Sequence, residues 1–236
     1  MSVAASLSIG SRAHFLYHSV IMASQPSSSP SSTIVLMHGL LGNAKNFQTL
    51  VKLLHKELRG EIDIVVLDLR SHGRTKVLGD LELDYEGMGK DVLHTCKQLN
   101  LEKVHLIGHS MGGKVTAAAC LAQQSDIDIL SATILDISPV EYSPDDEFKD
   151  VVHAIDFLET ATEGMTEATS KKDMMKSIDQ AFDDEAFRMF LGSNLAESEG
   201  TLQWKFSVPS ISQSRQSVLE WDLEGSFDRP LLLLKG

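Results

Sequence analysis

Gly108-His109-Ser110-Met111-Gly112-Gly113 follows an apolar run at residues 104–107 and precedes an alanine-rich segment that favours helix. A glycine-x-serine-x-glycine sequence between a strand and a helix predicts a sharp turn, because the glycines leave the room that the turn needs. In such a turn the serine hydroxyl is held clear of the sheet, and the first amides of the helix point toward a reacting group. We therefore expect Ser110 to be a nucleophile rather than part of a chance turn. The residues expected to support the turn are Gly108, His109 and Gly112.

Apolar runs typical of strands alternate with helical segments on both sides of this motif. Strands are predicted at residues 33–37, 62–67, 104–107 and 131–135, and helices at residues 45–58, 85–99 and 114–123. Short apolar strands separated by helices predict an α/β fold, with a mostly parallel sheet that is covered by helices on both faces.

The composition divides the chain into four parts. Residues 1–32 contain no Asp or Glu and are rich in Ser and Ala, which fits an organellar transit peptide or a disordered tail. Residues 33–142 are the expected core. Residues 143–204 contain acidic, methionine-rich helical stretches and no convincing strand, so we expect a helical cap inserted over the sheet, the alternative being a solvated helical extension. Residues 205–236 are expected to belong to the core again, and this last part of the core is expected to be incomplete.

Composition also excludes several classes of function. A chain of 236 residues with 42% apolar content is typical of one globular domain. Its formal net charge of −12 argues against a nucleic-acid partner, which would require a basic surface. No apolar run approaches the roughly 18 residues that a membrane span needs. Cys96 and Cys120 lack metal-ligand spacing and are expected to be buried free thiols. We expect no metal and no organic cofactor.

A serine nucleophile that accepts an acyl group needs donors for the oxyanion that forms. One expected donor is the amide of Met111, directly after the nucleophile. The loop at residues 38–42 follows the first core strand, where the second amide of such a site normally lies, and Leu40 is our choice for it. Gly39 and His38 are expected to support this loop, His38 as a hydrogen-bonding residue rather than as a catalytic base.

Three motifs together, at residues 38–42, 68–75 and 108–114, resemble those of the α/β-hydrolase superfamily in their order and spacing. The runs at 136–141 and 202–206 look like the family of alpha/beta-hydrolase domain-containing protein 11 and its related small bacterial esterases. The resemblance covers residues 33–236. It implies an α/β-hydrolase fold, cleavage of a small carboxylic ester or thioester, and a mitochondrial setting, with a cytoplasmic one as the alternative.

The remaining members of the expected triad are less clear from the sequence. Asp136 directly follows a predicted strand and is our choice for the acid that orients the base, although it could instead cap the following Ser-Pro turn. The resemblance also implies an aspartate after the tryptophan motif, but that position falls near Pro209. It implies a base histidine in a Gly-His-Trp type motif near the C-terminus, whereas no histidine follows His153.

The end of the chain, residues 230–236, has the pattern of a buried strand that stops where a functional loop should begin. We interpret the chain as C-terminally truncated, with an exposed apolar edge at residues 231–234. Without the base, only about 10³ to 10⁴ of rate enhancement over water would remain. The leading hypothesis is a serine hydrolase that forms an acyl-enzyme on Ser110 and is impaired by this loss.

Two other functions fit the same residues. A truncated hydrolase could bind a partner or an acyl ligand without turning it over, and the scaffold also supports acyl transfer or C–C bond hydrolysis. In the loop at residues 68–75, Arg70 and His72 could be read as an acid/base pair. We interpret them instead as structural residues, with Arg70 paired to Asp68.

Overall fold

The structure is a computed structural model of the chain. It describes residues 14–21, 32–75, 82–122, 126–144, 148–166, 169–198 and 200–235.

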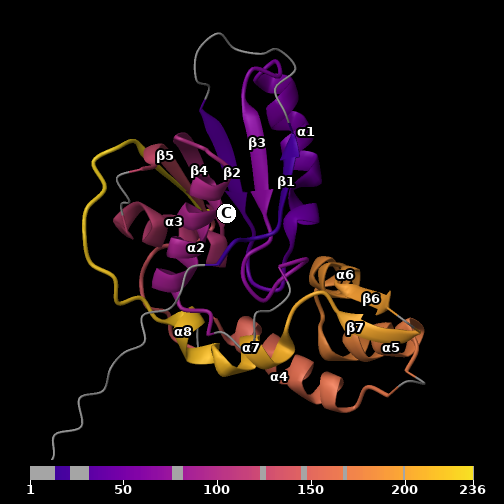
Figure 1. The fold of residues 1–236 in the computed structure, drawn as a ribbon. Helices are drawn as coiled ribbons and strands as arrows, with labels where there is room; N and C mark the ends of the chain where they lie inside the picture. The colour runs from indigo at the N-terminus through magenta and orange to yellow at the C-terminus, as the bar shows by residue number, and fades with distance from the viewer. Residues whose placement is uncertain are drawn as a thin grey trace, which may run out of the picture.

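A six-stranded sheet forms the centre of the described chain, in the order β1-β3-β2-β4-β5-β8 (Figure 1). Only β1 runs antiparallel to its neighbour, and all the other pairs are parallel. The predicted mostly parallel sheet is therefore confirmed. The strands are β1 (His18–Ile21), β2 (Thr33–Met37), β3 (Asp63–Leu67), β4 (Lys103–His109), β5 (Asp128–Leu135) and β8 (Leu231–Leu234).

Helices cover both faces of the sheet, because successive strand side chains point to opposite faces and both sets are apolar. Ile34 and Leu36 of β2 pack with α1 (Gln48–Glu57), which follows a short 3-10 helix, η1 (Ala44–Phe47). Val35 and Met37 of the same strand belong to the core on the other face. That core includes side chains of α2 (Tyr85–Gln98) and α3 (Met111–Ala122).

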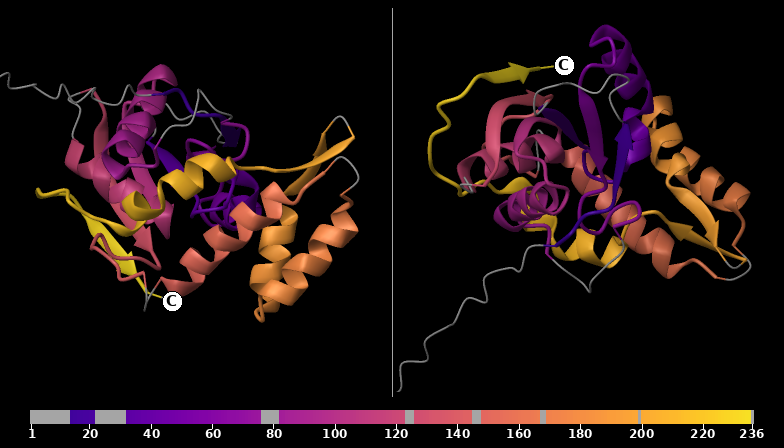
Figure 2. Two further views of the ribbon diagram at one scale, coloured as in Figure 1. Left: turned by 90° about the horizontal axis from the view of Figure 1, so that it is seen from below. Right: turned by 45° about the horizontal axis from the view of Figure 1, so that its top comes forward.

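The cap lies beyond the carboxyl ends of the parallel strands, in the orange part of the chain (Figure 1). It consists of α4 (Lys149–Glu163), α5 (Lys171–Ala181), α6 (Glu185–Ser193) and a hairpin of β6 (Leu195–Ser198) and β7 (Thr201–Trp204). The expectation that this region lacks strands is wrong, because β6 and β7 pair antiparallel. Two short helices, α7 (Val208–Gln213) and α8 (Arg215–Leu219), then lead back toward the core (Figure 2).

Two hydrogen bonds at the open end of the hairpin hold it to α4 and to the core. The Trp204 indole N–H donates to the hydroxyl of Thr162 in α4 at 3.1 Å. Asn194, which is fully buried, accepts a 2.9 Å hydrogen bond from the side-chain amide of Asn43, in the loop after β2. The cap is therefore tied directly to the loop that borders the nucleophile turn.

The expectation that residues 1–32 form only a tail or a transit peptide is wrong for residues 14–21. Leu16 is fully buried, and its amide donates to the hydroxyl of Thr95 in α2 at 3.0 Å. The strand β1 pairs with β3 over four residues. These contacts are made by backbone groups, which explains why the composition of the segment did not predict them. Residues 1–13 and 22–31 lie outside the described residues.

The last strand differs from the expectation of a buried strand. The four leucines of β8 pair with β5 but are each 50–54% exposed. In the described chain β8 is one of the two edge strands, with β5 as its only neighbour in the sheet. An exposed apolar edge at residues 231–234 is therefore confirmed.

The structure also bears on the two cysteines and on membrane-spanning helices. Cys96 and Cys120 are buried free thiols, as predicted. In the described ranges, no helix has the length and apolar character needed to cross a bilayer.

Candidate active site

Ser110 lies at the turn between β4 and α3, and its backbone is in the left-handed region with φ of 51°. A non-glycine residue rarely adopts this conformation unless the surrounding structure imposes it. Here the Ser110 amide donates to the Leu135 carbonyl at 2.9 Å, and the Gly113 amide donates to the Ser110 carbonyl at 2.7 Å. The predicted strand-turn-helix geometry is thus present, and it holds Ser110 in a strained backbone conformation.

The glycines around Ser110 are required by the close approach of backbone segments. A Cβ atom on Gly108 would overlap the Gly112 carbonyl and the Thr116 hydroxyl. One on Gly112 would overlap the carbonyl oxygen of Met37, at the end of β2. A Cβ on Gly39 would lie 3.2 Å from the Cβ of Ser110, so the loop after β2 runs directly beside the nucleophile.

Gly108→Ala is expected to destabilise the protein by about 2–4 kcal/mol, because a backbone carbonyl cannot move aside as a flexible side chain can. The matched control is Gly164→Ala at the end of α4, where the nearest atom would be 3.5 Å from the new Cβ. Urea unfolding of both variants measures the difference. Equal stability of the two variants would contradict this account of the turn.

A cavity of about 560 Å³ opens over Ser110, and the cap forms part of its wall. The loop after β2, the nucleophile turn and helices α4 and α6 contribute to its wall. Its lining residues are His38, Gly39, Leu40, Leu41, Gly42, Asn46, Phe47, His109, Ser110, Asp150, Val151, Ala154, Phe187 and Phe190. The structure thus brings together the expected residues Ser110, His109, His38, Gly39 and Leu40 with cap residues that the sequence analysis did not single out.

Two backbone amides close to Ser110 along the chain or across the turn have no hydrogen-bond acceptor in the described chain, and of the two residues only Leu40 lines the cavity. Neither the amide of Leu40 nor that of Met111 donates a hydrogen bond there. Met111 is the first residue of α3, where helix amides have no intrahelical acceptor. Leu40 lies in the loop whose Gly39 borders Ser110. The two amides expected as oxyanion donors are therefore free to bind an anionic oxygen.

His38 and His72 form a buried pair beneath the loop, with ring centroids 5.2 Å apart. In each ring, Nδ1 faces a backbone carbonyl, of Gly39 at 2.8 Å for His38 and of Arg70 at 2.9 Å for His72. In each ring, Nε2 accepts from a backbone amide, Leu69 to His38 at 3.0 Å and Leu41 to His72 at 3.1 Å. This arrangement requires neutral rings that donate from Nδ1. Both side chains have a structural position, and neither has a nitrogen left to act as a base.

Burial lowers the pKa of His38 to about 4 and that of His72 to about 3, against an ordinary value of 6.5. The unfolded chain therefore takes up protons at these two residues as the pH falls below about 6.5, while the folded protein does not. We expect the stability that the pair contributes to be complete above this pH. It should fall by up to about 1.4 kcal/mol per pH unit for each ring as the pH decreases toward 4.

Imidazole NMR signals measured from pH 8 to pH 4.5, together with urea unfolding over the same range, would test this prediction. Titration of either ring near pH 6.5 in the folded protein would contradict it.

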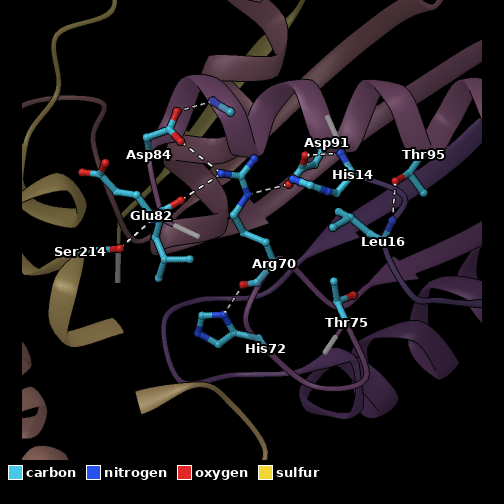
Figure 3. Close-up of polar contacts among 12 residues, drawn as sticks. His14, Leu16, Arg70, His72, Thr75, Glu82, Asp84, Asp91, Thr95 and Ser214 are labelled. Atoms are coloured by element: carbon cyan, nitrogen blue, oxygen red, sulfur yellow. Dashed lines mark hydrogen bonds and ion pairs between the residues drawn. The ribbon is translucent and has the colours of Figure 1, made fainter. Parts of the chain in front are cut away.

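Arg70 differs from the expected pairing with Asp68. Its Nε donates to Asp91 at 2.7 Å and its Nη1 to Asp84 at 3.1 Å, both in the region of α2 (Figure 3). Asp68 instead accepts from the amides of Ala44 at 2.6 Å and Arg74 at 2.8 Å. The reading of Arg70 and His72 as structural residues fits these contacts, but the expected partner of Arg70 was wrong.

Two carboxylates border the region of Ser110. Asp136 directly follows β5, at the carboxyl ends of the parallel strands, where Ser110 follows β4. Its backbone has a φ of 55°, and its amide donates to the Leu234 carbonyl at 2.7 Å. It is exposed and is not part of the cavity lining. Asp150 of α4 does line the cavity, although the sequence analysis did not select it. In the described residues, no three His, Cys, Asp or Glu side chains gather as a metal site.

Comparison with known proteins agrees with this geometry. The family model described as alpha/beta hydrolase fold matches residues 32–214. The chain belongs to the alpha/beta hydrolase fold family.

Individual relatives are similar along most of this chain. It is 29% identical over 207 residues to the sn-1-specific diacylglycerol lipase ABHD11 of Danio rerio. The aligned region covers 87% of this chain and 63% of that protein. It is 28% identical over 208 residues to the esterase YbfF of Escherichia coli, covering 87% of this chain and 74% of that protein. The chain therefore spans less than two thirds of the length of the first of these relatives.

Among solved structures, a marine microorganism esterase superposes with a TM-score of 0.79 at 25% sequence identity. The match covers 94% of this chain and 80% of that chain. The likeness thus includes the cap as well as the sheet.

Proposed function

We propose that this protein is a serine hydrolase that cleaves a carboxylic ester or thioester through an acyl-enzyme on Ser110. The observation that carries the proposal is a strained serine turn with two free amides close to it, at a cavity to which the cap contributes mostly apolar side chains. The names of the relatives, a lipase and two esterases, support ester hydrolysis as the reaction.

In the proposed reaction the Ser110 Oγ attacks the carbonyl carbon of the substrate, and a base takes up the hydroxyl proton. The carbonyl oxygen becomes an oxyanion, which the amides of Leu40 and Met111 bind. Collapse of this intermediate breaks the bond to the alcohol or thiol, which leaves with a proton from the protonated base. Water then attacks the acyl-enzyme by the same steps and releases the acid.

The cavity lining indicates the kind of substrate that would fit. Leu40, Val151, Ala154, Phe187 and Phe190 give the walls apolar surface suited to an acyl chain or an apolar alcohol. Asp150 is the acidic residue of the wall, and its charge would disfavour substrates with an anionic group near the scissile bond. We therefore propose neutral esters or thioesters with an apolar acyl part.

A second candidate function is binding of an acyl ligand without turnover. It is favoured by the positions of His38 and His72, because both are held neutral by backbone hydrogen bonds and cannot accept the proton of Ser110. Asp136 as the orienting acid remains part of the hydrolase proposal, with Asp150 as the carboxylate to compare with it.

Turnover of p-nitrophenyl esters separates the two functions. The proteins to compare are this chain and a version extended by a C-terminal segment that contains the Gly-His-Trp type motif implied by the family resemblance. We expect the extended version to turn over the ester and this chain to be at least about 10³-fold slower. Ser110-dependent turnover at equal rates in both would mean that a residue of this chain supplies the base. No turnover in either would leave ligand binding as the function.

We also propose a mitochondrial location, on the basis of the acid-free sequence at residues 1–32 and of the family resemblance. Because β1 and Leu16 are part of the fold, a removable presequence would be confined to the residues before His14. Import of a fusion of residues 1–13 to a reporter into isolated mitochondria tests this, and a reporter that stays outside would contradict it.

A further inference from the structure

A second cavity, of about 390 Å³, lies between the core and the cap hairpin and shares no lining residue with the cavity over Ser110. The short helix η1 contributes to both, with Ala44 and Lys45 on the second cavity and Asn46 and Phe47 on the first. The other residues of the second cavity are Tyr17, Ser19, Asn43, Gln48, Asp68, Gly73, Arg74, Ala196, Ser198, Gln203, Trp204 and Lys205.

Three cationic side chains line this cavity, Lys45, Arg74 and Lys205, in a chain whose net charge is −12. They come from η1, from the loop after β3 and from the end of the hairpin. Within the described residues, none of the three forms an ion pair with a carboxylate. Three cationic side chains share this lining with one carboxylate, so the wall carries an excess of positive charge that a bound anion would offset.

The surroundings of Lys205 agree with this excess of positive charge. Burial lowers the pKa of Lys205, and the nearby charges of Lys45 and Lys171 lower it further. Its ammonium donates to the Ser193 carbonyl at 2.6 Å, which holds the charge at the cavity. The Arg74 guanidinium is held by the hydroxyl of Tyr17.

The one carboxylate in the lining, Asp68, is already engaged. Its two oxygens accept from the backbone amides of Ala44 and Arg74, so it is committed to the loop rather than to the lysines. Neutral hydrogen-bonding side chains, Ser19 and Ser198, complete the wall. A group that carries two negative charges and several acceptor oxygens matches three cations and these hydroxyls better than a single carboxylate does.

We propose that this second cavity binds a phosphate group through Lys45, Arg74 and Lys205. The phosphate is either that of a soluble phosphorylated molecule or that of a lipid headgroup, since both present the same oxygens. The site is separate from the proposed ester site, so it can bind whether or not Ser110 is catalytic.

An NMR titration of the protein with inorganic phosphate, at constant ionic strength, tests the proposal. We expect saturable shifts of the amides of Lys45 and Lys205, and a dissociation constant at least about tenfold weaker in the double variant Lys45→Gln/Lys205→Gln. The matched control is Lys103→Gln, an exposed lysine at the opposite end of the sheet, which should bind as the wild type does. Lys205→Arg keeps the charge and should retain binding even if the double variant folds poorly.

Sedimentation with vesicles distinguishes the two sources of phosphate. Retention on phosphatidylcholine vesicles that contain phosphatidic acid, lost in the double variant, would identify a lipid headgroup. Phosphate binding in the titration without retention on vesicles would identify a soluble ligand. Shifts that do not saturate, together with no retention on vesicles, or equal weakening by Lys103→Gln, would overturn the proposal.

Discussion

Ser110→Ala is expected to abolish ester turnover in the version of the protein that carries the base histidine, with kcat reduced by on the order of 10⁴ to 10⁶. The reason is that no acyl-enzyme can form, and only binding and the oxyanion amides remain to accelerate attack by water. The measurement is p-nitrophenyl ester turnover at saturating substrate. Binding of the substrate should change little, since the removed hydroxyl is a small part of the cavity wall.

The matched control for this variant is Ser177→Ala, an exposed serine of α5 whose hydroxyl donates only to the Asp173 carbonyl in the same helix. It should retain full activity. If Ser110→Ala retained more than about a tenth of the rate, the nucleophile would have to be another residue or an activated water, and the proposed mechanism would be wrong.

Arg70→Met is expected to cost about 3–5 kcal/mol of the free energy of unfolding. Arg70 and Asp91 are almost completely buried, with side chains 3% and 1% exposed, and the substitution leaves the carboxylate of Asp91 without its cation (Figure 3). Within the described residues, the amide of His14 at 2.7 Å would be its remaining hydrogen-bond donor. The matched control is Arg229→Met, whose ion pair with Asp128 is largely exposed and should contribute less than about 1 kcal/mol.

The pH dependence of the stability lost in Arg70→Met gives a second, independent readout. Burial raises the pKa of Asp91, and the hydrogen bond and charge of Arg70 oppose that increase. Removing Arg70 therefore raises the pKa further, so the folded variant holds a proton that the unfolded chain releases. The variant should be least destabilised at low pH and increasingly destabilised as the pH rises through the raised pKa. A loss that is independent of pH would contradict a buried, uncompensated carboxylate as its cause.

Most of the core could be predicted from local sequence patterns. Apolar runs of four to six residues predicted β2, β3, β4 and β5, because strands buried on both faces read as continuous apolar segments. The nucleophile turn was predicted for a similar reason, since both the glycine spacing and the strand before it are local.

Features that depend on distant partners were predicted poorly. Arg70 pairs with Asp84 and Asp91, which lie 14 and 21 positions further along the chain, whereas the sequence suggested its near neighbour Asp68. The hairpin β6–β7 has only four residues in each strand, and its pairing rather than its composition defines it. Likewise, β1 is a four-residue segment of mixed polarity that becomes a strand because the edge of β3 is available to it.

The part of the cavity wall that the cap supplies could not be predicted from local sequence patterns either. Phe187 and Phe190 lie on one face of α6, and their helical spacing indicates an apolar face without indicating what it covers. Only the packing of the cap over the sheet shows that this face borders Ser110.

The most direct test of the central claim is to treat this chain with a fluorophosphonate ester and map the modified residue by peptide mass spectrometry. The account predicts one adduct, on Ser110, that is absent from Ser110→Ala and unchanged in Ser177→Ala. Ser110 is half-buried, and neither His38 nor His72 has a ring nitrogen free to act as its base, so labelling is expected to be slow. An adduct on another residue, or none after prolonged exposure, would contradict the assignment of Ser110 as the nucleophile.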